Sequence, residues 1–113
     1  MTTEQNRILR TVPREKAFYF FTSIGNYTGL NAASLKEFAE RMNEVNMKSL
    51  EFHLYRGDFE KWLEEVLNDA QLAEEIRKMR RVSLAGESLR NQLYATVSRQ
   101  LKRLTGQSGS LPI

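Results

Sequence analysis

The fold class of this 113-residue chain is decided by the stretch 58-DFEKWLEEVL-67, from Asp58 to Leu67. Its apolar residues recur at i, i+3, i+4, i+7 and i+8, which places them on one stripe of an α-helix; they are Phe59, Trp62, Leu63, Val66 and Leu67. Glu60, Glu64 and Glu65 fall on the other side. We therefore predict an amphipathic helix that buries Phe59 and Trp62, with Asp58 as its N-terminal cap, because Asp is a preferred capping residue.

Two helices are expected before this stretch. Ser34-Leu35-Lys36-Glu37 has the S-x-x-E form of a capping box, so an amphipathic helix should start at Ser34. Ser49 is expected to cap a second, shorter helix, and Gly57 is expected to end it, because glycine adopts the left-handed conformation that often ends a helix.

Two more helices are expected after the stretch. Asp69 should cap the first, whose apolar side is Leu72, Ala73, Ile76 and Met79. The last should begin near Ser83 and run to about Leu104, with Leu89, Leu93, Val97 and Leu101 on one side. Gly106 is expected to end it.

The aromatic run Ala17 to Phe21 could form a strand or a helix. We favour a short buried helix, because no second strand candidate is visible, and we expect a loop from Gly25 to Ala33. The predicted fold is all-α: about five short-to-medium helices in one compact domain with a longer basic C-terminal helix. Residues 1–12 are expected to be a flexible lead-in, 13–104 a single helical domain with a basic arm at 77–104, and 105–113 a flexible tail.

Charge is divided unevenly along the chain. Residues 1–76 carry nine Lys/Arg and thirteen Asp/Glu, a net charge of −4, whereas residues 77–113 carry eight and one, a net charge of +7. Such an asymmetry indicates a polyanionic partner or association between opposite charges.

Composition excludes several classes of protein. The chain has no cysteine, which excludes disulfides and thiolate chemistry and favours a cytoplasmic location. Its longest apolar run, Ala17 to Phe21, is far shorter than the roughly 20 residues of a membrane span, and we expect no membrane association. No nucleotide or metal-binding motif is present, so no cofactor is expected.

His53 is the only histidine, and Asp58 lies five residues after it. A histidine beside a carboxylate is compatible with general acid-base catalysis or with a buried structural hydrogen bond. We favour the structural interpretation and keep a sugar- or phosphate-acting enzyme centred on His53 as a minor alternative.

The basic arm has three interpretations. It could be a solvated helix, a docking element for the acidic Asp58 to Glu75 region of a second copy, or an RNA-binding surface. Phosphate contacts are expected from seven residues: Arg77, Lys78, Arg80, Arg81, Arg99, Lys102 and Arg103. Arginine suits this role because its planar fork binds phosphate oxygens.

Several short motifs together resemble an uncharacterised, largely archaeal domain of unknown function. They are Phe18-Tyr19-Phe20, Gly29 with Ala33, Leu35-Lys36-Glu37-Phe38, Ser49-Leu50 with His53, Asp58-Phe59 with Trp62, Val66-Leu67 and Leu72-Ala73. Some longer relatives carry a second histidine two residues after the first, where this chain has Tyr55. The resemblance covers roughly Phe18 to Ala73, implies a compact helical domain and brings no established activity.

These observations lead to one functional hypothesis and one alternative. We expect a non-catalytic helical protein that binds RNA or a ribonucleoprotein such as a ribosomal subunit, as a homodimer. The alternative is a protein-interaction adaptor that does not bind nucleic acid.

Overall fold

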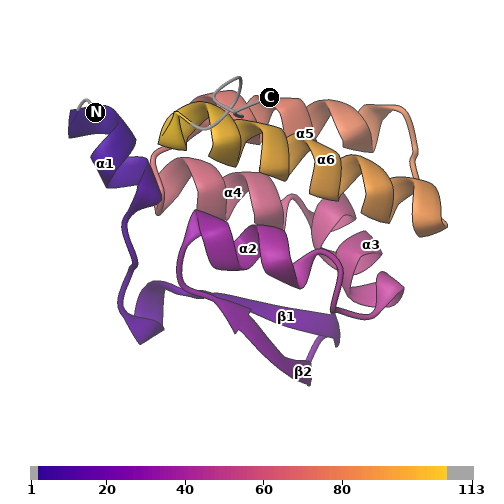
Figure 1. The fold of residues 1–113 in the computed structure, drawn as a ribbon. Coiled ribbons are helices and arrows are strands. Elements are labelled where there is room, and N and C mark those ends of the chain that lie inside the picture. The colour runs from indigo at the N-terminus through magenta and orange to yellow at the C-terminus, as the bar shows by residue number, and fades with distance from the viewer. Residues whose placement is uncertain (1–2, 107–113) are drawn as a thin grey trace.

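The computed structural model describes residues 3–106, which form six α-helices and one two-stranded antiparallel sheet. The elements in chain order are α1 (Thr3–Leu9), a 3₁₀ turn (Arg14–Lys16), β1 (Phe18–Ser23), β2 (Asn26–Ala32), α2 (Leu35–Arg41), α3 (Met47–Arg56), α4 (Asp58–Glu65), α5 (Ala70–Arg81) and α6 (Gly86–Thr105). Figure 1 shows the hairpin at one end of the molecule, α2, α3 and α4 above it, and α5 and α6 side by side at the far end.

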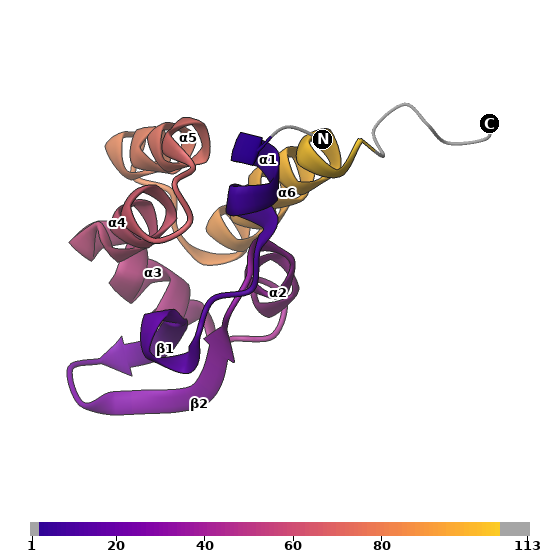
Figure 2. The same ribbon diagram turned by 90° about the vertical axis from the view of Figure 1, so that its left-hand side faces the viewer.

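The helices pack in two stacks, which the rotated view separates (Figure 2). One holds α3, α4 and α5, and the other holds α2 and α6, with α1 beside α6. Helices α5 and α6 are antiparallel: Gln100 near the end of α6 donates hydrogen bonds to Asp69, the N-terminal cap of α5. The hairpin closes the core, where Phe18 and Phe20 pack against Phe59.

The all-α prediction is wrong, because Phe18 to Ala32 forms a β-hairpin. The aromatic residues alternate as in a strand: Phe18 and Phe20 are buried, and Tyr19 and Phe21 are half-buried. Ser23 pairs with Asn26 across a two-residue turn, in which Gly25 has φ +80°. Glycine adopts this conformation without steric cost, which permits the tight connection.

The second strand was not predicted, because its sequence lacks the alternation of apolar and polar residues that is typical of a strand. In β2 only Ala32 is buried, and the sequence NYTGLNA does not alternate between apolar and polar residues. The strand is held by pairing with β1 and by Thr28, whose hydroxyl donates to the carbonyl oxygen of Phe20 at 2.8 Å. Tertiary pairing therefore outweighs the weak local pattern.

The chain ends also differ from the expectation. Residues 1–12, expected as a lead-in, contain α1, and Ile8 and Val12 are buried in the core. Gly106 ends α6 in the left-handed conformation, as predicted. The remainder of the expected tail, residues 107–113, lies outside the described residues.

Of the four predicted N-terminal caps, two are correct and two are wrong. Ser34 caps α2 and Asp69 caps α5, each through a side-chain oxygen. Asn46, not Ser49, caps α3, and Ser83 precedes α6, whose capping position is Ala85. Asp58 lies inside α4 and makes no cap hydrogen bond. The predicted burial of Phe59 and Trp62 is confirmed.

Candidate nucleic-acid interface

The seven basic residues predicted to contact phosphate do not form one surface. Arg77 and Arg80 point to α4, where they bind Glu60. Lys78 and Arg81 are exposed near the end of α5. Arg99, Lys102 and Arg103 are exposed near the end of α6.

Glu60 is the centre of an ion-pair cluster. Its side chain accepts a hydrogen bond from Arg77 Nε at 2.9 Å and one from Arg80 Nη1 at 2.7 Å. Only 8% of Glu60 is exposed, whereas the sequence placed it on the solvated side of the helix. Since removing either arginine would leave this largely buried carboxylate with only one of its two cationic partners, we assign Arg77 and Arg80 a structural role.

Arg77 also binds two other acidic residues. It donates hydrogen bonds to Glu74 within α5 and to Glu64 on α4 at 3.4 Å. The hydrogen bonds to Glu74 and Glu60 raise the pKa of the Arg77 guanidinium above its ordinary value. These contacts also occupy part of the acidic region that a second copy was expected to bind.

Three exposed cations near the end of α6 share one face with a tyrosine. Tyr94, Arg99, Lys102 and Arg103, which we call the α6 cationic face, line a shallow hollow of about 590 Å³. Tyr94 is 41% exposed. Among residues 3–106, Lys102 and Arg103 have no ion-pair partner, and Arg99 has only Glu75, at 3.7 Å. These cations are therefore available to an external anion.

Arg81 lies at the other end of α6 from Lys102, whereas Lys78 is one helical turn from Glu75, the partner of Arg99. Because α5 and α6 are antiparallel, Arg81 is close to the start of α6, whereas Lys102 lies sixteen residues beyond Gly86. At 1.5 Å per residue, this separation along α6 is roughly 24 Å. The charge asymmetry of the sequence thus corresponds to basic residues spread along α5 and α6, of which three line the α6 cationic face.

His53 is buried and uses both ring nitrogens inside the protein. Its Nε2 accepts a hydrogen bond from the backbone N–H of Phe21 at 2.8 Å, which places the proton on Nδ1. Nδ1–H donates to Asp58, which also accepts from Arg56 Nε at 3.0 Å. Burial lowers the pKa of His53, although the hydrogen bond to Asp58 acts in the opposite direction. This geometry supports the structural interpretation and leaves no nitrogen directed at a substrate.

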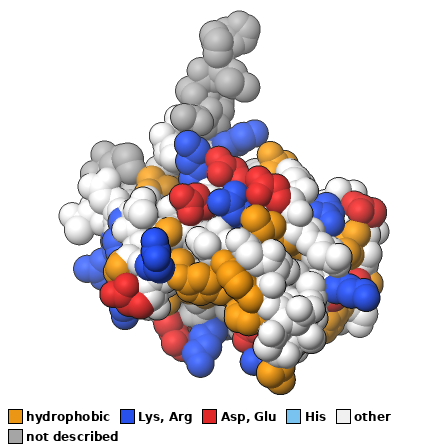
Figure 3. Space-filling view, turned by 90° about the horizontal axis from the view of Figure 1, so that it is seen from below, with side chains coloured by type: hydrophobic (Ala, Val, Ile, Leu, Met, Phe, Trp, Pro, Cys, Tyr) orange, Lys and Arg blue, Asp and Glu red, His pale blue; other side chains and the backbone are white. Residues whose placement is uncertain are grey.

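A second exposed feature was missed in the sequence. The ring of Tyr27 lies against Tyr19 and Phe21, with centroids 5.7 and 5.4 Å apart. Ile24, at the hairpin turn, is 83% exposed. We call these four residues the hairpin aromatic face; viewed from the hairpin side, hydrophobic side chains gather in the middle of the surface (Figure 3). The alternation of Phe18 to Phe21 would have indicated this face had a strand been assigned.

Residues 3–106 contain neither a metal-binding cluster nor a membrane-spanning helix. No group of three or more His, Cys, Asp or Glu side chains there could hold a metal ion. In the same part of the chain, no helix has the length and apolar character needed to cross a membrane.

Comparisons with known proteins identify a family but no activity. A family model described as "Family of unknown function (DUF5752)" matches residues 1–99. No curated protein and no solved structure matches the chain.

Proposed function

The chain belongs to the DUF5752 family of unknown function, and we propose from its own residues that it binds RNA or a ribonucleoprotein through the α6 cationic face. The observation that carries this proposal is the contrast between two arginines of α5, Arg77 and Arg80, and two basic residues near the end of α6, Lys102 and Arg103. Arg77 and Arg80 are neutralised by Glu60, whereas Lys102 and Arg103 have no ion-pair partner among residues 3–106.

The composition of this face favours a single-stranded nucleic acid. Arg99, Lys102 and Arg103 lie at spacings of one, three and four residues, so their side chains share one side of the helix and suit neighbouring phosphates. Tyr94, about two turns earlier, has an exposed ring on which an unpaired base can stack. A base in a duplex would not be available to this ring.

The direct test measures binding of a fluorescent single-stranded RNA at several salt concentrations. If the three cations neutralise three phosphates, log affinity should fall with log salt concentration at a slope of about −2. The triple variant Arg99→Gln, Lys102→Gln, Arg103→Gln should lose most of this slope and bind weakly. The double variant Lys78→Gln, Arg81→Gln is the matched control, and it should retain most of the affinity.

Two results would contradict the proposal. One is no binding to single-stranded RNA at low salt. The other is an equal loss in the control and triple variants, which would indicate a diffuse electrostatic effect instead of a defined face.

A protein-interaction adaptor is the second candidate function, and the hairpin aromatic face favours it. Aromatic residues are enriched at protein interfaces. Under this alternative, the triple variant of α6 would keep its partner, whereas Tyr27→Ser with Ile24→Ser would lose it. The two candidates therefore make opposite predictions for the same pull-down from lysate at low salt.

Three finer points remain part of the proposal. We propose a cytoplasmic location, since the chain has no cysteine. We propose a ribosomal subunit as one example of a ribonucleoprotein partner, which co-sedimentation in a sucrose gradient would test. Self-association as a homodimer also stays a prediction, which sedimentation equilibrium of the purified protein would test.

A further inference from the structure

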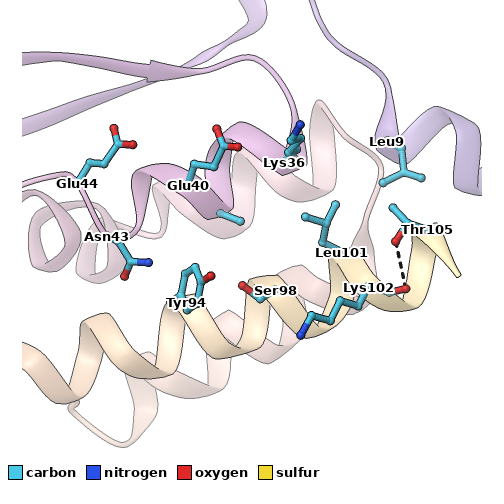
Figure 4. A pocket seen from close by; sticks show the side chains of 11 residues that line it. Leu9, Lys36, Glu40, Asn43, Glu44, Tyr94, Ser98, Leu101, Lys102 and Thr105 are labelled. Atoms are coloured by element: carbon cyan, nitrogen blue, oxygen red, sulfur yellow. Dashed lines mark hydrogen bonds between the residues drawn. The ribbon is translucent and has the colours of Figure 1, made fainter. Parts of the chain in front are cut away.

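A groove runs between α2 and α6 and has a volume of about 800 Å³ (Figure 4). Leu9, Ala39 and Leu101 supply apolar side chains to it. The two helices are antiparallel here: Lys36, at the start of α2, lies across from Leu101, whereas Asn43, after α2, lies near Tyr94, earlier in α6. Beyond the end that holds Tyr94, Arg90 of α6 donates a hydrogen bond to the carbonyl oxygen of Met42 at 2.8 Å.

The charges on the rim of the groove are separated along its length. Lys36 and Lys102 lie toward the end that contains Thr105, and Glu40 and Glu44 lie toward the other end (Figure 4). Glu44 is paired with Arg41 at 3.2 Å, whereas Lys36, Glu40 and Lys102 have no ion-pair partner within residues 3–106. These three charges are therefore available to a molecule that enters the groove.

The length of the groove suits a short helix. From Tyr94 to Thr105, α6 advances eleven residues, or about 17 Å. A bound helix of the same length makes about three turns and can place apolar residues at i, i+4 and i+7 on an apolar floor.

We propose that this groove binds an amphipathic helix of a partner protein, with acidic residues at the end over Lys36 and Lys102 and basic residues at the end over Glu40. The apolar stripe of the partner helix would cover Leu101 and Ala39. The charged ends would set its direction, because the reverse placement brings like charges together.

This inference goes beyond the proposed RNA binding and can fail independently of it. Arg99 and Arg103 line the α6 cationic face but not the groove, whereas Leu101 and Lys36 line the groove but not that face. Tyr94 and Lys102 belong to both. A helix and an RNA strand would therefore compete where the two sites meet.

The test uses two designed helical peptides of about four turns with the same composition and the same leucine stripe. In the first peptide, Glu residues are at one end and Lys residues at the other; in the second, Glu and Lys alternate. Fluorescence anisotropy should show about three- to tenfold tighter binding of the first peptide, since two exposed ion pairs are formed only by it. Amide chemical shifts should change along α2 and α6.

Variants locate the binding and separate the two proposals. Leu101→Asn should weaken both peptides, because it makes the floor polar. Lys36→Glu, a surface change that leaves the core intact, should weaken the charge-separated peptide and strengthen a third peptide that has Lys at both ends. Lys48→Glu, at an exposed lysine outside the groove, is the matched control and should change little. Arg103→Gln should leave peptide binding unchanged while weakening RNA.

The inference is overturned if neither peptide binds, or if the two bind equally. It is also overturned if Lys48→Glu has as large an effect as Lys36→Glu, because the effect would then reflect net charge alone. If the native protein binds the charge-separated peptide but does not bind single-stranded RNA, only the RNA proposal is refuted.

Discussion

His53 and Asp58 are joined by a 2.8 Å contact between Nδ1 and Oδ2, although the two residues lie on different helices. The other ring nitrogen of His53 accepts the backbone N–H of Phe21, a donor in the hairpin. One side chain therefore connects the hairpin to the junction of α3 and α4. The sole histidine of the chain holds three elements together.

Replacing His53 should destabilise the fold. His53→Ala removes both hydrogen bonds and leaves a cavity beside Phe18 and Phe20, so we expect the free energy of unfolding to fall by about 2–4 kcal/mol. Urea denaturation followed by Trp62 fluorescence measures this change. His53→Gln can form one of the two hydrogen bonds and should lose less. Equal and small losses in both variants would contradict the connecting role.

The pH dependence of stability should carry the signature of His53. Burial lowers the pKa of His53 below its ordinary value of 6.5, so the unfolded chain binds this proton more readily than the folded one. The contribution of neutral His53 to the free energy of unfolding is complete above about pH 6.5 and is lost as the pH falls below that value. Urea denaturation from pH 8 to pH 5 should show this loss in the native protein, whereas His53→Gln should lack this component.

Glu60 should contribute to stability without contributing to RNA binding. Glu60→Gln removes the charge shared by Arg77 and Arg80 and should lower the free energy of unfolding by about 1–3 kcal/mol. Glu65→Gln, at an exposed position, is the control and should change stability by less than about 0.5 kcal/mol. Chemical denaturation of both variants checks this.

The same cluster separates structural from binding arginines. Arg80→Gln should destabilise the protein while leaving its affinity for single-stranded RNA unchanged, and Arg103→Gln should do the reverse. Anisotropy at low salt and urea denaturation of the two variants make the comparison. A large loss of RNA affinity in Arg80→Gln would contradict this prediction, because it would indicate that α5 forms part of the RNA-binding surface.

Local sequence signals predicted the helices well. The stripe that begins at Phe59 and the cap at Asp69 act within one or two turns, so spacing and residue type are sufficient to predict them. The hairpin was not predicted, because β2 depends on pairing with β1 for its conformation. A strand with one buried residue has no local signal strong enough to be recognised.

The candidate site was only partly predictable for a related reason. Counting charges identified the basic C-terminal segment, but only the packing of α5 against α4 decides that Arg77 meets Glu60. Asp58 was misjudged in the same way: its position suggested a cap, whereas the nearby imidazole of His53 became its partner. Contacts between different elements depend on tertiary geometry, which spacing along the chain does not encode.

Ser49 offers a last test of the helix assignments. Expected as a cap, it lies instead inside α3, fully buried, and its hydroxyl oxygen has no hydrogen-bond partner among residues 3–106. Ser49→Ala removes this uncompensated hydroxyl and introduces a better helix former, so the free energy of unfolding should stay equal or rise by about 0.5–1 kcal/mol. Ser34→Ala, which removes the working cap of α2, is the matched comparison and should lose about 1 kcal/mol. Thermal or urea denaturation of both variants gives the answer. A loss in Ser49→Ala as large as that in Ser34→Ala would mean that the Ser49 hydroxyl is satisfied by a partner such as a buried water, and the expected gain would be refuted.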